Sequence, residues 1–334
     1  MGVLFINSFV YSYSDVLVVS HSTTPFVSAY PWSAAGFGSK YTDPATLPAS
    51  NGRSAGFSPS GNDLLIGHET TPFVSAYPWS AGFGTKYANP ATLPTGTVYG
   101  IGFTPSGSDV ALSYLATPWL SAYPWSSGFG TKYADPATTP TGFSYNVEFT
   151  ASGNDVIVGH AVTPFVTAYP WSSGFGTKYA NPTTLAAGNS QGLAVSTSTS
   201  DVVLPHATTP FVSAYPWSAG FGAKYADPAT LPTGTGRAAS FISPDNDLVI
   251  THDTTPFVTA YAWSSGFGSK YADPATLPAG NGRGIASSPA GKDIGVAHQT
   301  TPFVTAYPWS NGFGAKYADP AILPTGTAVG ITFR

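Results

Sequence analysis

The sequence contains no cysteine, and only 8% of its 334 residues are charged. The lack of cysteine excludes disulfide bonds, thiolate metal sites and cysteine nucleophiles. An average soluble domain has roughly 25% charged residues, so this surface is expected to be largely neutral. The net charge of −4 comes with no basic run, whereas a nucleic-acid-binding protein needs a basic stripe to neutralise phosphates. We therefore expect no nucleic-acid partner, and nothing in the sequence indicates a cofactor or a metal.

Long apolar segments are missing as well. No run reaches the roughly 18 apolar residues of a transmembrane helix, so no membrane insertion is expected. The first residues, "MGVLFINSFVYSYSD", carry no Lys or Arg before their apolar part, unlike a secretory signal. This segment is more typical of a β-strand.

What the sequence does have is repetition. The dipeptide Trp-Ser recurs with a spacing of 47 residues once and 46 residues thereafter. Its tryptophans are Trp32, Trp79, Trp125, Trp171, Trp217, Trp263 and Trp309. Periods of roughly 40–50 residues are typical of propellers and of helical arrays. Short runs rich in Val, Ile, Phe, Tyr and Thr, broken by Gly and Pro, favour strands over helices.

One repeat divides into four predicted strands, at 52–57, 63–68, 73–79 and 83–89. Four antiparallel strands form one propeller blade, and a blade alone cannot bury both of its faces. We therefore predict an all-β, seven-bladed β-propeller with four-stranded antiparallel blades and a 46–47-residue repeat. Residues 1–334 are expected to form this single domain.

Three repeats contain the related segments "FSPSG" (57–61), "FTPSG" (103–107) and "SSPAG" (287–291). These segments resemble the end of the inner strand in the WD40-like propeller superfamily. No Gly-His pair precedes the first strand of a repeat and no Trp-Asp pair ends the third strand, so the hydrogen-bonded tetrad of the WD40 family is not implied here. The near-identical units also resemble those of uncharacterised phage and environmental propellers. This resemblance implies a fold and no particular activity.

Closure of the ring has two candidate strands. The segment "TAVGITF" (327–333) copies "TVYGIGF" (97–103), and residues 7–15 also fit the inner strand of the first blade. We favour 327–333 as the strand that closes the ring, which leaves residues 1–10 as an extra strand or a docking segment. The alternative is that the array was cut from a longer one.

Two sets of repeated side chains are candidates for function. Histidine ends the second strand of six repeats, at His21, His68, His160, His206, His252 and His298, and Tyr114 takes its place in the third. One histidine per blade is too dispersed for a shared metal ion, so we favour a structural role in hydrogen bonding. The seven Trp-Ser tryptophans could stack on sugars, but we favour burial between blades.

The repeats differ most at the start of the inner strand. The equivalent residues there are Arg53, Tyr99, Tyr145, Gln191, Arg237, Arg283 and Val329. Arg, Tyr and Gln are common at contact surfaces, so the first six form a hypothetical binding rim at one mouth of the channel. Drift at solvent-filled positions explains the variation about equally well. We also predict that the three arginines lie on one face.

No catalytic set stands out from the repeated background. The only glutamates, Glu69 and Glu148, belong to different repeats, and no paired carboxylates are evident. We therefore predict a non-enzymatic structural or protein-interaction scaffold, with a protein partner or assembly. A virion or extracellular setting is favoured over the cytoplasm. The alternative is a lectin-like propeller that binds glycans through the seven tryptophans.

Overall fold

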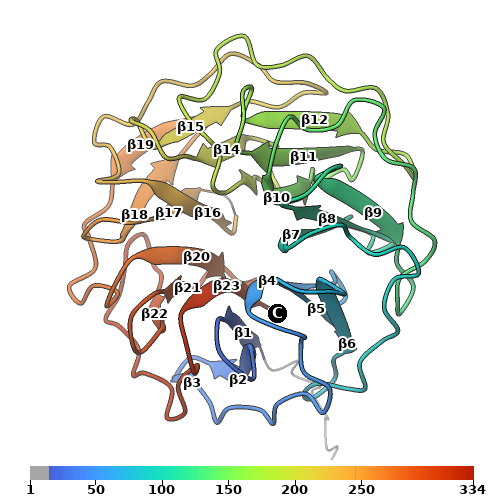
Figure 1. Cartoon of the computed structure of the whole chain (residues 1–334). Helices are drawn as coiled ribbons and strands as arrows, with labels where there is room; N and C mark the ends of the chain where they lie inside the picture. Colours follow the sequence, from blue (N-terminus) through green and yellow to red (C-terminus); the bar gives the residue numbers. More distant parts are fainter. Residues whose placement is uncertain (1–14, 245) are drawn as a thin grey trace, which may run out of the picture.

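The computed structural model describes residues 15–244 and 246–334, and every regular element within them is a β-strand. Seven antiparallel sheets are arranged radially about a central axis (Figure 1). This confirms the predicted all-β, seven-bladed propeller. The described residues contain no helix that could cross a bilayer.

Each blade is built outward from the axis, and we number the blades from 1 to 7 along the chain. The inner strands, in that order, are β23 (Ala328–Phe333), β4 (Gly52–Phe57), β7 (Val98–Phe103), β10 (Ser144–Phe149), β13 (Ala194–Val195), β16 (Gly236–Ile242) and β20 (Gly282–Ser287). The second strands are β1 (Val16–His21), β5 (Asp63–His68), β8 (Asp109–Tyr114), β11 (Asp155–His160), β14 (Val202–Pro205), β17 (Asp247–His252) and β21 (Asp293–His298). The third strands are β2 (Val27–Ser33), β6 (Val74–Pro78), β9 (Leu120–Pro124), β12 (Val166–Pro170), β15 (Val212–Tyr215), β18 (Val258–Trp263) and β22 (Val304–Pro308).

Within residues 15–244 and 246–334, the predicted fourth strand is present in only two blades, as β3 (Gly36–Phe37) and β19 (Phe267–Lys270). In the other five blades a single bridge replaces it, such as Trp79 with Phe83. Proline explains most of this difference. The Pro78 carbonyl accepts from the Gly84 N–H at 2.8 Å, but proline has no N–H to donate in return. Blade 6, which has the longer fourth strand, carries Ala262 in place of that proline.

Blade 1 combines the two ends of the described chain. Its inner strand, β23, pairs antiparallel with β1, from Leu17 opposite Phe333 to His21 opposite Ala328. The amide N–H of Arg334 also donates to the Val16 carbonyl, at 2.9 Å. The last described strand thus lies beside the first. The other segment considered for this place, 7–15, and the suggested docking segment, 1–10, fall on residues 1–14, outside the described residues apart from Asp15.

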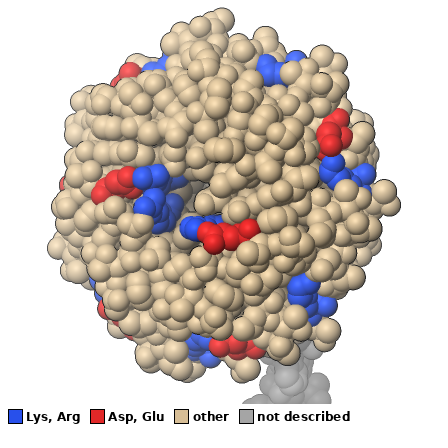
Figure 2. All heavy atoms as spheres, in the orientation of Figure 1, with Lys and Arg blue, Asp and Glu red and all other residues tan. Residues whose placement is uncertain are grey.

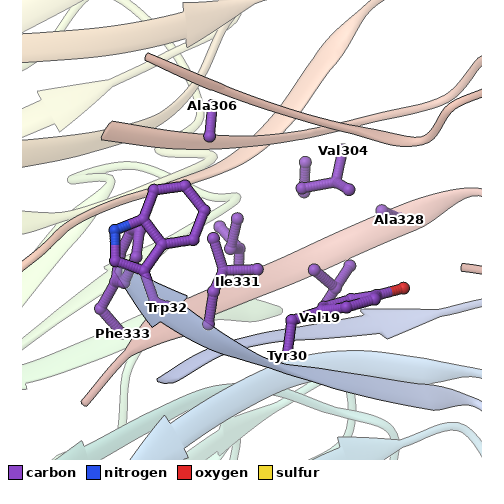
Figure 3. Packing of buried hydrophobic residues seen from close by; sticks show 10 residues of the cluster. Val19, Tyr30, Trp32, Val304, Ala306, Ala328, Ile331 and Phe333 are labelled. Carbon is purple, nitrogen blue, oxygen red and sulfur yellow. The ribbon is translucent and has the colours of Figure 1, made fainter. Parts of the chain in front are cut away.

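The hydrophobic core lies between the blades rather than within them. Seven apolar clusters each join two neighbouring blades, and together they follow the whole ring. The cluster between blades 7 and 1 packs Val304 against Val19 and sets Trp32 beside Phe333 (Figure 3). All residues of most second strands are buried, because these strands are covered on both faces. The inner strands surround a hollow at the centre of the face in Figure 2.

Candidate functional site

The six predicted rim residues come together at one mouth of the central channel. Together with Gln299, Thr327 and Val329 they line a cavity of about 260 Å³, which opens on the face shown in Figure 2. An adjoining cavity of about 220 Å³ continues along the channel and shares all six. The rim residues in ring order are Arg53, Tyr99, Tyr145, Gln191, Arg237 and Arg283. The three arginines therefore lie on the same face of the ring.

Five of the six rim residues lie at a β-bulge of the inner strand. In blade 2, Gly52 pairs with His68 and Ser54 with Gly67, so Arg53 between them has no partner on the second strand. The same shift occurs at the rim residues of blades 3, 4, 6 and 7 and at Val329 of blade 1. In blade 5 the backbone N–H of Gln191 instead donates to the Pro205 carbonyl at 2.9 Å. Bulges redirect side chains and are frequent beside functional sites. The sequence showed where the repeats differ, but it did not show that the variable residue is the unpaired one.

The basic side of the mouth contains two ion pairs. Arg53 binds Glu69, and Arg237 makes a two-pronged contact with Asp253 in which Nε lies 2.7 Å from Oδ1. Arg237 also donates to the amide oxygen of Gln191 at 2.9 Å. The acids follow their arginines by sixteen residues and lie in the turn after the second strand. That constant spacing is a signal that the sequence analysis missed.

Arg283 differs from the other two arginines because Gln299 occupies the position of their acids. In the amide orientation that satisfies both groups, the Gln299 oxygen accepts from Arg283 Nε at 3.0 Å. Burial, and then the positive charge of Arg237, lower the pKa of Arg283. Arg283 is thus a half-buried cation that faces a neutral partner.

The opposite side of the mouth is aromatic. The rings of Tyr99 and Tyr145 meet edge to face, with centroids 5.8 Å apart. The guanidinium of Arg53 lies over the Tyr99 ring, 5.6 Å from its centroid, as in a cation–π contact. Burial and the neighbouring Tyr99 raise the pKa of Tyr145, so its hydroxyl remains a hydrogen-bond donor at neutral pH.

Glu148 lies deeper in the channel, on β10. It lines both the 220 Å³ cavity and a second cavity of about 290 Å³ toward the opposite mouth. Its carboxyl accepts from the Val195 N–H at 3.0 Å. Burial raises the pKa of Glu148 to about 8, so the group is largely a neutral acid at pH 7. The sequence analysis noted this glutamate but gave it no role.

The histidines lie inside the blades. All six are fully buried, and Nε2 of each contacts a Ser or Thr hydroxyl on the third strand of its own blade, as between His206 and Ser213 at 3.0 Å. Tyr114 makes the corresponding contact with Ser121 at 2.7 Å. Burial lowers the pKa of His206 to about 4, and the other five behave alike. Within the described part of the chain, no three His, Asp or Glu side chains cluster closely enough to hold a metal ion.

The seven repeated tryptophans lie in the core between blades, only 2–7% exposed. Their ring faces are covered, so they offer no surface on which a sugar could stack. Instead, six indole N–H groups donate to an aspartate of the preceding blade, as from Trp125 to Asp63 at 3.0 Å. The hydroxyl of Tyr87 donates to the other oxygen of Asp63 at 2.8 Å. This Asp–Tyr–Trp triad ties two blades together, and sequence analysis assigned no role to its aspartate.

Comparisons with known proteins support the fold. No protein-family model and no curated protein matches the sequence. Among solved structures, the chain is similar to a periplasmic gluconolactonase of Pseudomonas aeruginosa, with TM-score 0.71, 13% identity and coverage of 96% of this chain and 99% of the other. A putative 6-phosphogluconolactonase of Bacteroides fragilis gives TM-score 0.71 and 13% identity over 97% and 98% of the two chains. The chain is also similar to the Swd1 β-propeller domain of Myceliophteria thermophila, with TM-score 0.58 and 10% identity over 80% of this chain and 87% of the other.

These structures correct one prediction. The sequence analysis predicted that the protein is not an enzyme, and two of these three similar structures carry enzyme names. That prediction rested on the missing set of catalytic groups, but a propeller channel can present a single titratable group such as Glu148. At 13% identity the likeness concerns the fold, and the activities belong to those proteins.

Proposed function

We propose that this protein is an interaction propeller that binds a ligand at the Arg- and Tyr-lined mouth of its channel. One observation carries the proposal: six residues that differ between otherwise near-identical repeats line the same cavity. Drift at solvent-filled positions would not require arginines and tyrosines at five bulges, with a glutamine between them, around one opening. Arg and Tyr are also the residue types that contribute most at binding sites.

The two ends of the channel differ in chemistry, and this supports the choice of mouth. Among the described residues, the lining of the cavity toward the other end contains no Arg or Tyr and consists of Glu148, hydroxyl side chains such as Ser240, and apolar side chains such as Phe241. The glycan-binding alternative receives no support from the tryptophans, because their rings are buried. The virion or extracellular setting stays a prediction.

The experiment is a thermal-shift screen of sugars, sugar acids, amino acids and short peptides on the native chain. Each hit is then measured by calorimetry on Tyr145→Ala, which removes a partly exposed ring from the rim. Ser240→Ala, at the opposite mouth, is the matched control. We expect Tyr145→Ala to weaken binding by about tenfold or more and Ser240→Ala to leave it unchanged. Equal effects of the two variants would contradict the proposal.

A second candidate function is hydrolysis of a sugar lactone, which Glu148 and the names of two similar structures favour. Water would add to the lactone carbonyl and the ring C–O bond would break. Glu148 would give its proton to the leaving ring oxygen and recover one from the attacking water. A strongly shifted pKa in a cavity is typical of such groups.

Glu148→Gln tests this candidate, because the amide keeps an oxygen for the Val195 N–H but has no acidic proton. If the native chain hydrolyses gluconolactone, the variant is expected to be about a hundredfold slower. An equal rate in both proteins, or no hydrolysis by the native chain above background, would rule the candidate out.

A further inference from the structure

Among the described residues, one arginine of the channel mouth, Arg283, forms no ion pair with an acidic side chain. Three blades place an arginine at the rim bulge, and the residue sixteen positions later faces it. That residue is Glu69 for Arg53 and Asp253 for Arg237. For Arg283 it is Gln299, which is polar and of similar size to Glu but uncharged. The position that faces the arginine therefore holds an acidic residue in two blades and a neutral glutamine in the third.

The missing charge leaves the mouth with a local excess of one positive charge. The three arginines carry three positive charges, and Glu69 and Asp253 carry two negative ones. Arg283 is half-buried, so water solvates its charge only in part. Burial and the nearby Arg237 lower the pKa of Arg283, so both destabilise its charged form. An anion bound against Arg283 would relieve both effects.

The surroundings of Arg283 restrict the size and charge of that anion. Arg53 and Arg237 already bind carboxylates, whereas Nε and Nη2 of Arg283 contact the amide oxygen of Gln299. A ligand with one negative charge, displacing that amide, would balance the charge of Arg283. A carboxylate matches the planar guanidinium fork, whereas a phosphate dianion would exceed the local charge. Across the mouth, Tyr99 and Tyr145 offer hydroxyl groups and ring edges to the rest of the ligand.

Resting on the proposed function, we propose that Arg283 is the anion-binding residue of the mouth and that the ligand carries a carboxylate. Two sources supply this group: a free small acid, such as a sugar acid, or the carboxyl terminus of a peptide. Both present the same atoms to Arg283, and they differ in the part of the ligand that would lie beneath the tyrosines.

Calorimetry on the native chain separates the two sources. The probes are sodium gluconate, sodium acetate, inorganic phosphate, and triglycine with a free or an amidated carboxyl terminus. Binding of gluconate or of free triglycine supports the proposal and names the source, and amidated triglycine is expected not to bind. The proposal would be overturned if phosphate bound more tightly than every carboxylate probe. It would also be overturned if gluconate did not bind and the free and amidated triglycines bound equally well.

Gln299→Glu gives the sharpest test, since it builds beside Arg283 the ion pair that Arg53 already has. The arginine stays in place, but its charge becomes occupied, and we expect carboxylate affinity to fall by about tenfold to a hundredfold. Lys292→Gln is the matched control, because it removes one positive charge from an exposed residue outside the mouth cavities. Unchanged affinity in Gln299→Glu would overturn the proposal.

Glu69→Gln supplies the opposite change. It frees Arg53 as Gln299 frees Arg283, so carboxylate affinity is expected to rise or a second binding event to appear. A fall in affinity would count against the charge argument. The outcomes also separate this inference from the proposed function. If Tyr145→Ala weakens binding and Gln299→Glu does not, the mouth is the binding site but the ligand is not recognised through a carboxylate at Arg283.

Discussion

The junction between blades 1 and 2 differs from the six other junctions of the ring. At those six, an aspartate at the start of the second strand accepts from a tyrosine hydroxyl and from the tryptophan of the next blade. The indole bonds join Trp32 to Asp293, Trp125 to Asp63, Trp171 to Asp109, Trp217 to Asp155, Trp263 to Asp201 and Trp309 to Asp247, at 3.0–3.4 Å. At the seventh junction Val16 takes the aspartate's place, and the buried indole N–H of Trp79 has no hydrogen-bond partner in the described part of the chain.

This difference shows which interactions the ring can lose. The apolar cluster at the seventh junction is complete, with Val16, Ile66 and Trp79 buried together and Tyr41 edge to face with Trp79 at 5.3 Å. Hydrophobic packing therefore holds two blades together without the triad. An unpaired buried N–H costs about 1–3 kcal/mol, so this junction is expected to be the weakest in the ring.

Acidification should give the largest effect, and it tests whether the blades themselves or the junctions limit stability. Burial lowers the histidine pKa values to about 4 from 6.5, so between these pH values the unfolded chain binds protons that the folded chain excludes. Stability is therefore present above about pH 6.5 and is lost as the pH falls, by up to about 1.4 kcal/mol per pH unit for each histidine. Urea unfolding between pH 7 and pH 4.5 measures this slope.

His206→Tyr is the matched control for the acid effect, since it copies the Tyr114–Ser121 pair of blade 3 onto Ser213. The free energy of unfolding of this variant should fall less steeply with decreasing pH than that of the native chain, because one of the six titrating histidines is gone. A slope that does not change would show that the histidines are not the groups that take up the protons.

Asp109→Val should give the next largest effect, because it copies the seventh junction into blades 3 and 4. The change keeps a branched side chain of similar size but leaves the hydroxyl of Tyr133 and the indole of Trp171 without their acceptor. We expect the free energy of unfolding to fall by about 2–4 kcal/mol. A loss below about 0.5 kcal/mol in urea unfolding would mean that the triads contribute little and that the seven junctions are equivalent.

Sequence analysis could predict the ring but not this weak point. The repeat and its strand composition were sufficient for seven blades, since each near-identical unit needs a neighbour on both faces. Asp15 looks like the missing aspartate, yet it precedes His21 by six residues, whereas Asp63 precedes His68 by five. That one-residue difference moves Asp15 out of register, so that Val16 pairs opposite Pro31 where Asp63 pairs opposite Pro78.

The candidate site was predictable in part, for similar reasons. Differences between repeats marked Arg53, Arg237 and Arg283, because a position that faces the channel is free of the packing that fixes the core. Their partners were not recognised, since the ion pairs depend on a bulge and on a turn that meet only in the folded blade. The prediction of a fourth strand was wrong in five blades, because the proline of the third strand has no N–H to donate to it. The sequence does not show that this proline faces the fourth strand.

Val16→Asp should have the reverse effect of Asp109→Val, and a smaller one. The new carboxylate would lie at the position from which Asp63 reaches Trp125, with Tyr41 and Trp79 as its donors. Burying a carboxylate costs part of what the two hydrogen bonds contribute, so we expect a net gain of about 1 kcal/mol. A rise in the melting temperature over the native chain measures it, and a fall would show that this junction has adapted to valine.

The smallest expected effect compares one hydroxyl at two junctions. Tyr133→Phe removes the 2.6 Å hydrogen bond to Asp109 and should cost about 1 kcal/mol. Tyr41→Phe removes the equivalent hydroxyl where Val16 offers no acceptor, so stability should change by no more than about 0.3 kcal/mol. Both variants keep the ring and its edge contact with tryptophan, Tyr133 to Trp171 at 5.3 Å and Tyr41 to Trp79 at 5.3 Å, so packing is matched. Because the two changes are chemically identical, the difference between their urea midpoints isolates the aspartate. Equal losses would mean that the hydroxyl acts through solvent or packing and that the carboxylate is not what separates the seventh junction from the rest.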